Sequence, residues 1–315
     1  MKLLMENWQQ FLDEDANAAE VDPKMFPSKL SAVDAGRAKT LSNTGVQDGE
    51  IEDDTIPVGN WQGAAKDLKP SQNTMNLGKA AWFALGMLNG TMFGSGGPGG
   101  NLGAFVSSDN YMMDGHHRWV ATAMSKPSAG MSGYLVGFPG KQLVAILNTI
   151  TKGLLGVDKG KPGEGNFAQF HNRDAVVQVL ANLAQDKQES GKFNDDGTPK
   201  IFTGVAGAME PGMALKVIET KTGKKGQEAV EAMADFMLAN VKTVPGVSDS
   251  AVLLPQGRAD MPVIDDSDGP VQPASKIAIK ALKGGEVNVN PPYEKGQQQQ
   301  VAAESRKRIR IKSKK

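Results

Sequence analysis

The fold is decided by one stretch of sequence, Ala104-Phe-Val-Ser-Ser-Asp-Asn-Tyr-Met-Met-Asp-Gly-His-His-Arg-Trp-Val-Ala-Thr-Ala-Met124. Its first ten residues predict a β-hairpin, because two apolar, β-prone segments flank the turn-forming Ser108-Asp-Asn110. Its last nine residues predict a helix that begins just after Gly115. A helix that follows a strand through a glycine presents backbone N–H groups and a partial positive charge at its start. The stretch therefore predicts a phosphate site at this junction.

The side chains at this junction add to the predicted site. Gly115 lets the backbone approach an anion closely. Arg118 brings a guanidinium that binds two oxygens at once, and His116 and His117 bring further donors. Asp114 would lie beside the phosphates, where a carboxylate holds Mg²⁺ or accepts a proton.

The surrounding segments predict an α+β fold made of several parts. Apolar residues at helical spacing predict helices over 76–90, 141–151, 173–187 and 226–242, and a short apolar segment predicts a strand over 133–137. We expect an N-terminal helix with an acidic, disordered linker over 1–60 and a nucleotide-binding domain over 61–151. A helical insertion or subdomain over 152–258 and a segment that packs on the folded domain over 259–295 should follow. The chain should end in a disordered Gln-rich and basic tail over 296–315.

The composition of the 315-residue chain excludes several classes of function. It has no cysteine, which excludes disulfides, thiolate metal sites and a cysteine nucleophile. It has no apolar run of the roughly 18 residues that a membrane helix needs, so we expect no membrane partner. The net charge is zero, but residues 1–60 contain 12 acidic and 5 basic residues, and residues 306–315 contain seven basic and no acidic residues.

The basic end of the chain predicts nonspecific binding to nucleic acid, since runs of like charge often bind partners. The cations expected to contact phosphates are Arg306, Lys307, Arg308, Arg310, Lys312, Lys314 and Lys315. The alternative is that this tail pairs with the acidic residues of 1–60.

The junction at 114–118 resembles the ParB/sulfiredoxin superfamily. Its nuclease-like and kinase-like branches carry a strand followed by Asp-Gly-His-His-Arg, which this chain matches letter for letter. Residues 67–72, Asp-Leu-Lys-Pro-Ser-Gln, resemble the early segment of the family, a short strand that ends in a proline-containing turn. The resemblance covers about 61–150.

This resemblance implies a small mixed-sheet domain that binds a nucleoside triphosphate, ATP or CTP, with Mg²⁺. Gly115, His116, His117 and Arg118 would line the phosphates, and Asp114, His116 and His117 would be the catalytic group. Two departures from the family matter. The missing cysteine excludes sulfiredoxin chemistry, and Gln72 stands where some members have a catalytic glutamate, although an amide cannot act as a base.

The N-terminus is similar to the capsid-targeting leaders of internal proteins in tailed phages. Leu4-Met-Glu6 and Leu12-Asp-Glu14 match the sequence after which the prohead protease cuts. The resemblance implies a capsid or scaffold partner for residues 1–14 and a location in the virion or in the cytoplasm of the host cell. The alternative is an amphipathic helix that docks on its own protein.

Two functions of different class follow from these patterns. The first is an enzyme, a nucleotide-dependent nuclease, NTPase or phosphotransferase of phage origin. The second is a noncatalytic nucleotide- or DNA-binding or virion-associated protein that keeps the ParB-like fold. A further alternative treats the two histidines as no more than a hydrogen-bonded helix start.

Overall fold

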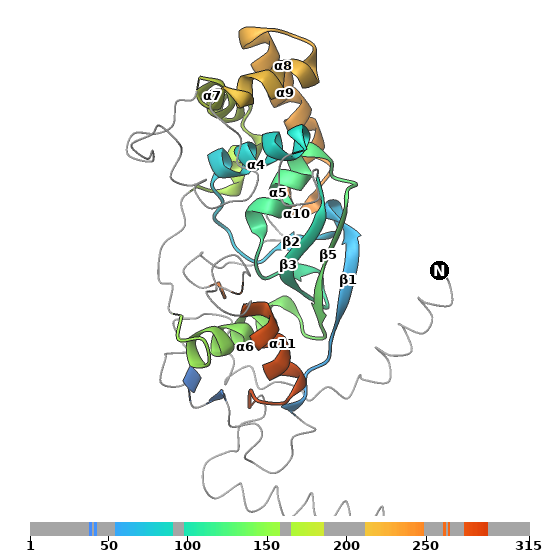
Figure 1. The fold of residues 1–315 in the computed structure, drawn as a ribbon, viewed down its shortest axis with the longest axis vertical. Helices are drawn as coiled ribbons and strands as arrows, with labels where there is room; N and C mark the ends of the chain where they lie inside the picture. Colours follow the sequence, from blue (N-terminus) through green and yellow to red (C-terminus); the bar gives the residue numbers. More distant parts are fainter. Residues whose placement is uncertain are drawn as a thin grey trace, which may run out of the picture.

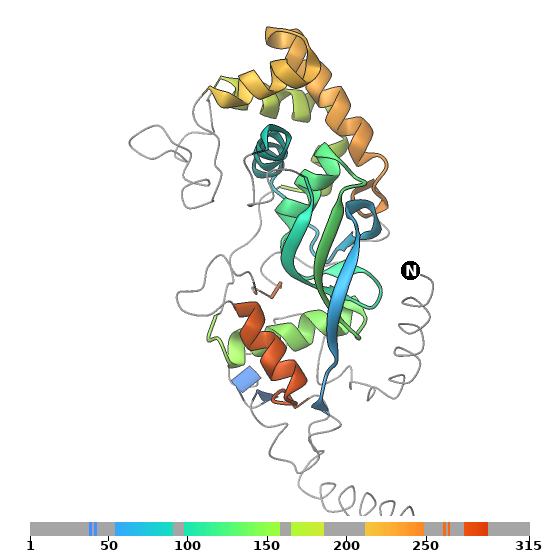
Figure 2. The same ribbon diagram turned by 45° about the vertical axis from the view of Figure 1, so that its right-hand side comes forward.

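The computed structural model describes residues 38–39, 41–42, 54–90, 98–157, 165–185, 212–248, 261–262, 264 and 274–288. These residues form an α+β fold with a mixed sheet, as the sequence predicts. Figures 1 and 2 show the sheet in the middle, with α6 and α11 at one end of the molecule and α7, α8 and α9 at the other. None of the helices in the described ranges is long and apolar enough to cross a membrane.

The five strands lie in the order β1-β5-β3-β4-β2. Their bounds are β1 Val58–Ala64, β2 Lys69–Pro70, β3 Gly100–Ser107, β4 Tyr111–Met112 and β5 Gly130–Val136. The predicted hairpin is present, since β3 and β4 pair antiparallel with Val106 opposite Met112. Asn110 makes its turn with a φ of 67°, a conformation that asparagine tolerates. The pairs β3–β5 and β4–β2 are parallel, and β1–β5 is antiparallel.

The helices cover both faces of the sheet. Their bounds are α4 Leu77–Asn89, α5 His116–Ser125, α6 Gly140–Gly153, α7 Arg173–Ala184, α8 Met213–Thr222, α9 Gly226–Val241, α10 Pro245–Ser248 and α11 Ala274–Lys283, with 3₁₀ turns η3 at Ala65–Asp67 and η4 at Phe167–His171. Because side chains alternate along a strand, Val106 packs in the cluster with α4 and α5, and its neighbour Phe105 packs in the cluster with α6 and α11.

Helix α4 begins and ends within a residue of the range predicted from the sequence. The side chain of Asn76 accepts a hydrogen bond from the backbone N–H of Lys79 at 2.8 Å, which caps its start. Gly90 ends it in the left-handed conformation, with a φ of 74°.

Helices α7, α8 and α9 share one hydrophobic cluster with α4, α5 and the sheet. Buried residues of 165–248 therefore share a core with α4, α5 and one face of the sheet. The sequence predicts α7 and α9 but not α8. Arg173 of α7 binds both carboxylate oxygens of Asp235 of α9, at 2.7 and 3.1 Å, and joins these two helices at the surface.

Part of the segment expected as a disordered linker, 1–60, is folded. Leu41 and Ile56 are buried in the cluster with α6 and α11. Ser42 bridges to Val287, and the N–H of Ile56 donates to the carbonyl of Leu282 at 2.9 Å. Their partners lie more than 220 residues away in the chain, so no local pattern could reveal these contacts. The N-terminal helix predicted over 1–14 lies outside the described residues.

Candidate anion site at the start of helix α5

The candidate site lies where two parallel strands end side by side. Lys69 of β2 pairs with Tyr111 of β4, and Pro70 pairs with Met112. The chain that leaves β2 at Ser71 therefore lies next to the chain that leaves β4 at Met113. In open sheets, the carboxyl ends of parallel strands are the usual place for ligands.

His116 joins the two strand ends. Its side chain is 4% exposed, and its Nε2 lies 3.2 Å from both the backbone N and the Oγ of Ser71. The Ser71 hydroxyl donates to the carbonyl of Met112 at 2.5 Å. Nε2 therefore accepts the Ser71 N–H, which places the imidazole proton on Nδ1. Any part that His116 plays in binding is thus through Nδ1 or through positioning α5.

Gly115 forms the start of α5. It is buried and adopts a φ of 77°, which favours glycine. Its carbonyl accepts the hydrogen bond of the Trp119 N–H at 3.0 Å, and no side chain caps the helix. An α-helix supplies no acceptor for the N–H groups of its first turn, which here belong to residues 116–118. Those N–H groups and the helix dipole favour negative charge at this point.

Asp114 supplies negative charge at the same helix end. Its Oδ1 accepts a hydrogen bond from the N–H of Gly115 at 2.6 Å, and its Oδ2 accepts one from the N–H of Ile264 at 3.3 Å. The carboxylate thus ties the segment around Ile264 to the start of α5. It also opposes a second anion at this site, unless a cation lies between them.

His117 and Arg118 occupy the second and third positions of α5 and are both half-buried. The Arg118 carbonyl accepts a hydrogen bond from the Thr122 hydroxyl at 2.9 Å, one turn further along the helix. The structure therefore brings all five residues of the predicted motif to one strand–helix junction.

Gln72 lies beside this junction. It is 5% exposed, and its Nε2 donates to the carbonyl of Thr74 at 2.8 Å. The Gln72 side chain therefore holds the segment that follows β2.

Among the described residues, Asp114 is the carboxylate at the junction that the sequence predicts to hold Mg²⁺. No group of three or more His, Asp or Glu side chains in the described ranges is arranged to hold a metal. At the junction itself, both oxygens of Asp114 already accept backbone N–H groups. His171, the third histidine of the chain, lies elsewhere, with its Nε2 2.7 Å from the carbonyl of Val247.

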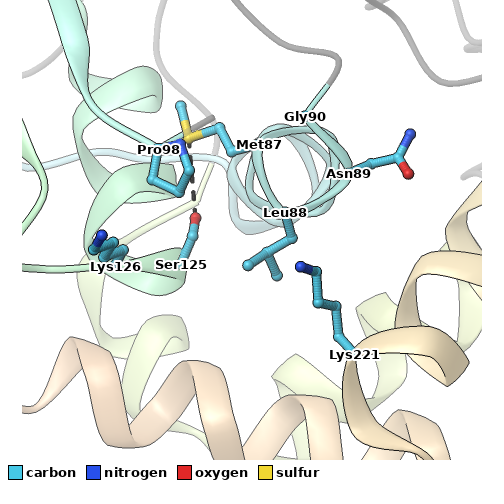
Figure 3. Close-up of a pocket in the computed structure, with 8 residues that line it drawn as sticks. All are labelled: Met87, Leu88, Asn89, Gly90, Pro98, Ser125, Lys126 and Lys221. Atoms are coloured by element: carbon cyan, nitrogen blue, oxygen red, sulfur yellow. Dashed lines mark hydrogen bonds between the residues drawn. The ribbon is translucent and has the colours of Figure 1, made fainter. Parts of the chain in front are cut away.

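A hollow of about 400 Å³ lies at the other end of α5. It is lined by Met87, Leu88, Asn89, Gly90, Pro98, Ser125, Lys126 and Lys221. Figure 3 shows Lys221 of α8 pointing toward Leu88 of α4, while the Ser125 hydroxyl faces the sulfur of Met87 at 3.9 Å. No sequence motif marks these residues, and the hollow has no part in the 114–118 junction.

Two of the predicted sites fall outside the described residues. They are the seven cations of 306–315 and the cleavage sequences within 1–14.

Comparison with protein-family models, curated proteins and solved structures finds no match to this chain. The resemblance to the ParB/sulfiredoxin superfamily stays a prediction that rests on the residues at the junction.

Proposed function

We propose that the protein binds a nucleoside triphosphate, ATP or CTP, with its phosphates at the start of helix α5. The observation that supports this most strongly is the junction itself. The ends of β2 and β4 lie side by side there, and a left-handed Gly115 opens a helix whose first turn carries His117 and Arg118. This is the arrangement in which backbone N–H groups bind phosphate.

In this proposal each residue has a separate part. Gly115 leaves room for the backbone to approach a phosphate, and Arg118 contributes a guanidinium that binds two of its oxygens. His117 adds a donor from the first turn. His116 holds α5 against the end of β2 through Ser71, and is a positioning residue.

The geometry favours binding over turnover. Phosphoryl chemistry at this site would ask Asp114 to hold a metal or to accept a proton. Its two oxygens instead accept hydrogen bonds from Gly115 and Ile264. The Gln72 amide cannot replace the missing glutamate. We therefore propose a ParB-like binding protein as the function, and a Mg²⁺-dependent nuclease or NTPase as the alternative.

Calorimetric titration with ATP, CTP and GTP tests the proposal. Arg118→Ala removes a charge-assisted interaction worth roughly 1.5–3 kcal/mol, which corresponds to about one to two decades in Kd. Lys126→Ala is the matched control, because it removes a cation from the opposite end of the same helix. Equal affinity in the wild type and Arg118→Ala would refute the site, as would equal losses in the two variants.

We also propose nucleic acid as a partner, through the cations of 306–315. A chain ending at Ser305 should bind duplex DNA more weakly and with a smaller dependence on salt. If the full chain and the truncated chain bind equally, the tail has no part in binding.

We also propose that residues 1–14 direct the protein into a phage capsid. Protein recovered from mature particles should then begin after Glu6 or Glu14.

A further inference from the structure

Strand β1 forms one edge of the sheet and leaves part of its backbone unpaired. It pairs with β5 along all seven of its residues, and no described strand lies on its other side. The N–H of Ala64 donates to Oδ2 of Asp67 at 2.8 Å, so Ala64 faces away from β5. Because the residues of an antiparallel strand alternate between its two sides, Val58, Asn60 and Gln62 also face outward. Figure 1 shows β1 at the outer edge of the sheet.

The three residues Val58, Asn60 and Gln62 form what we call the open edge. Within the part of the chain that the structure describes, their outward N–H and C=O groups make no hydrogen bond. Hydrogen bonds to the positions on either side give the open edge its limits.

These limits lie at Ile56 and Ala64. The N–H of Ile56 donates to the carbonyl of Leu282 at 2.9 Å, and the N–H of Ala64 is held by Asp67. A partner strand can therefore take its full set of hydrogen bonds only between these two positions. The segment available to a partner is short, and Asn60 lies at its centre.

The two edges of the sheet are built differently. β2, at the opposite edge, has only two residues, Lys69 and Pro70. A short strand, a lysine and a proline are all means by which proteins prevent pairing at a sheet edge. β1 is longer, contains neither a charged residue nor a proline, and pairs with β5 without a bulge. The described part of β1 therefore carries none of these protections.

The chemistry of the open edge fits a second copy of the same chain. A two-fold axis places a strand against its own copy, so a strand that carried charge would repel itself. The open edge has no charge, and its two exposed side chains, Asn60 and Gln62, are amides. An amide both donates and accepts hydrogen bonds, so it can pair with another amide.

We propose that two copies of the chain pair antiparallel through the open edge, with Asn60 on the two-fold axis. Val58 of each copy then lies opposite Gln62 of the other, and opposite residues exchange two backbone hydrogen bonds. If the axis moved by one residue in either direction, an open residue would meet Ile56 or Ala64, whose N–H groups are already held.

This pairing would join the two five-stranded sheets into one continuous sheet. It uses neither the start of α5 nor the basic residues of 306–315. The inference therefore goes beyond the proposed binding functions and does not depend on them.

The first test uses disulfide formation, because the chain has no cysteine of its own. Asn60→Cys should form a covalent dimer in a glutathione redox buffer, since opposite Cα atoms of a hydrogen-bonded pair lie about 5.5 Å apart, within the range that a disulfide spans. Gln62→Cys is the matched control from the same strand. Its two copies would be offset by four residues, roughly 13 Å, so it should not cross-link. Equal cross-linking of the two variants would overturn the proposal.

The second test measures self-association by sedimentation equilibrium. The wild type should approach twice the chain mass of 33.4 kDa as its concentration rises. Asn60→Pro removes an N–H that faces away from β5, so the monomer should keep its strand. The dimer loses two hydrogen bonds, and its Kd should rise by about five- to 150-fold.

Thermal melting of Asn60→Pro, at a concentration where the wild type is monomeric, checks that the variant folds. If it does not fold, Asn60→Lys takes its place, because two like charges opposite each other should also weaken the dimer. An unchanged Kd in the folded variant would show that the dimer uses another surface, and would overturn the proposal. A wild type that stays monomeric would overturn it as well, and would leave the open edge to a strand of a different protein.

Discussion

The variant Asp114→Asn distinguishes between an anion site and a metal site at the start of α5. The amide keeps one oxygen to accept the N–H of Gly115, but its NH₂ group then faces the N–H of Ile264, where Asp114 now accepts. The charge-assisted hydrogen bond from the N–H of Ile264 is lost, and this N–H then faces the NH₂ donor of the new amide. The free energy of unfolding should therefore fall by about 1.5–3 kcal/mol.

Nucleotide affinity should change in the opposite direction. For an assumed separation of about 6 Å between this carboxylate and a phosphate on the first turn of α5, two unit charges repel by about 0.7–2.8 kcal/mol for effective dielectric constants of 80 to 20. In EDTA, Asp114→Asn should therefore bind ATP or CTP about three- to a hundredfold more tightly than the wild type.

The assay is calorimetric titration of both proteins, first in EDTA and then with Mg²⁺. Asp109→Asn is the control, because that carboxylate accepts the N–H of Gly140 at 2.8 Å at the start of α6, away from the site. Weaker binding by Asp114→Asn in EDTA would refute an anion site at this helix end. Weaker binding in Mg²⁺ alone would show that Asp114 holds the metal and would favour the enzyme.

Three further variants test the structure around the site. Gly115→Ala should lower the free energy of unfolding by about 1–2 kcal/mol, because its φ of 77° is strained for a residue with a Cβ, and chemical denaturation should show a smaller loss for Gly115→Asn. His116→Ala leaves the buried N–H of Ser71 without its acceptor and should cost about 1–3 kcal/mol by the same measurement, and a neutral result would contradict the positioning role. The hydrogen bond from Arg173 lowers the pKa of Asp235 in the folded protein. The contribution of this ion pair to stability is therefore complete above the unfolded pKa of 3.8 and is lost as the pH falls through the lower folded pKa. Asp235→Asn should therefore lower the Tm slightly at neutral pH and leave it unchanged at a pH below the folded pKa of Asp235.

The parts of the fold that the sequence predicts are those with local signals. The hairpin at 104–113 follows from its turn residues, and α4 follows from its apolar pattern. β1 has no such signal, because it is an edge strand with only Trp61 buried along its length. Helix α11, within the segment 259–295, is likewise not predicted.

The candidate site divides in the same way. The motif at 114–118 identifies the junction, because it is contiguous in the chain. The contacts that define what its side chains can do are long-range. Ser71 lies 45 residues from His116, and Ile264 lies 150 residues from Asp114. Neither contact leaves a pattern in the sequence. The hydrogen bonds of His116 to Ser71 and of Asp114 to Ile264 are therefore visible only in the structure.

The contacts of Leu41, Ser42 and Ile56 with residues 282–288 have a consequence for folding during synthesis. The sheet is complete once β5 has emerged, at Val136, but the α6–α11 side needs residues up to Asn288. At a synthesis rate of about 5–20 residues per second, roughly 8–30 s separate these two events. During that interval the N-terminal residues Leu41 and Ile56 have no α11 to pack against, and the apolar side chains of α6 are left partly uncovered on the ribosome. The nascent chain is therefore most prone to aggregate between the emergence of β5 and that of α11.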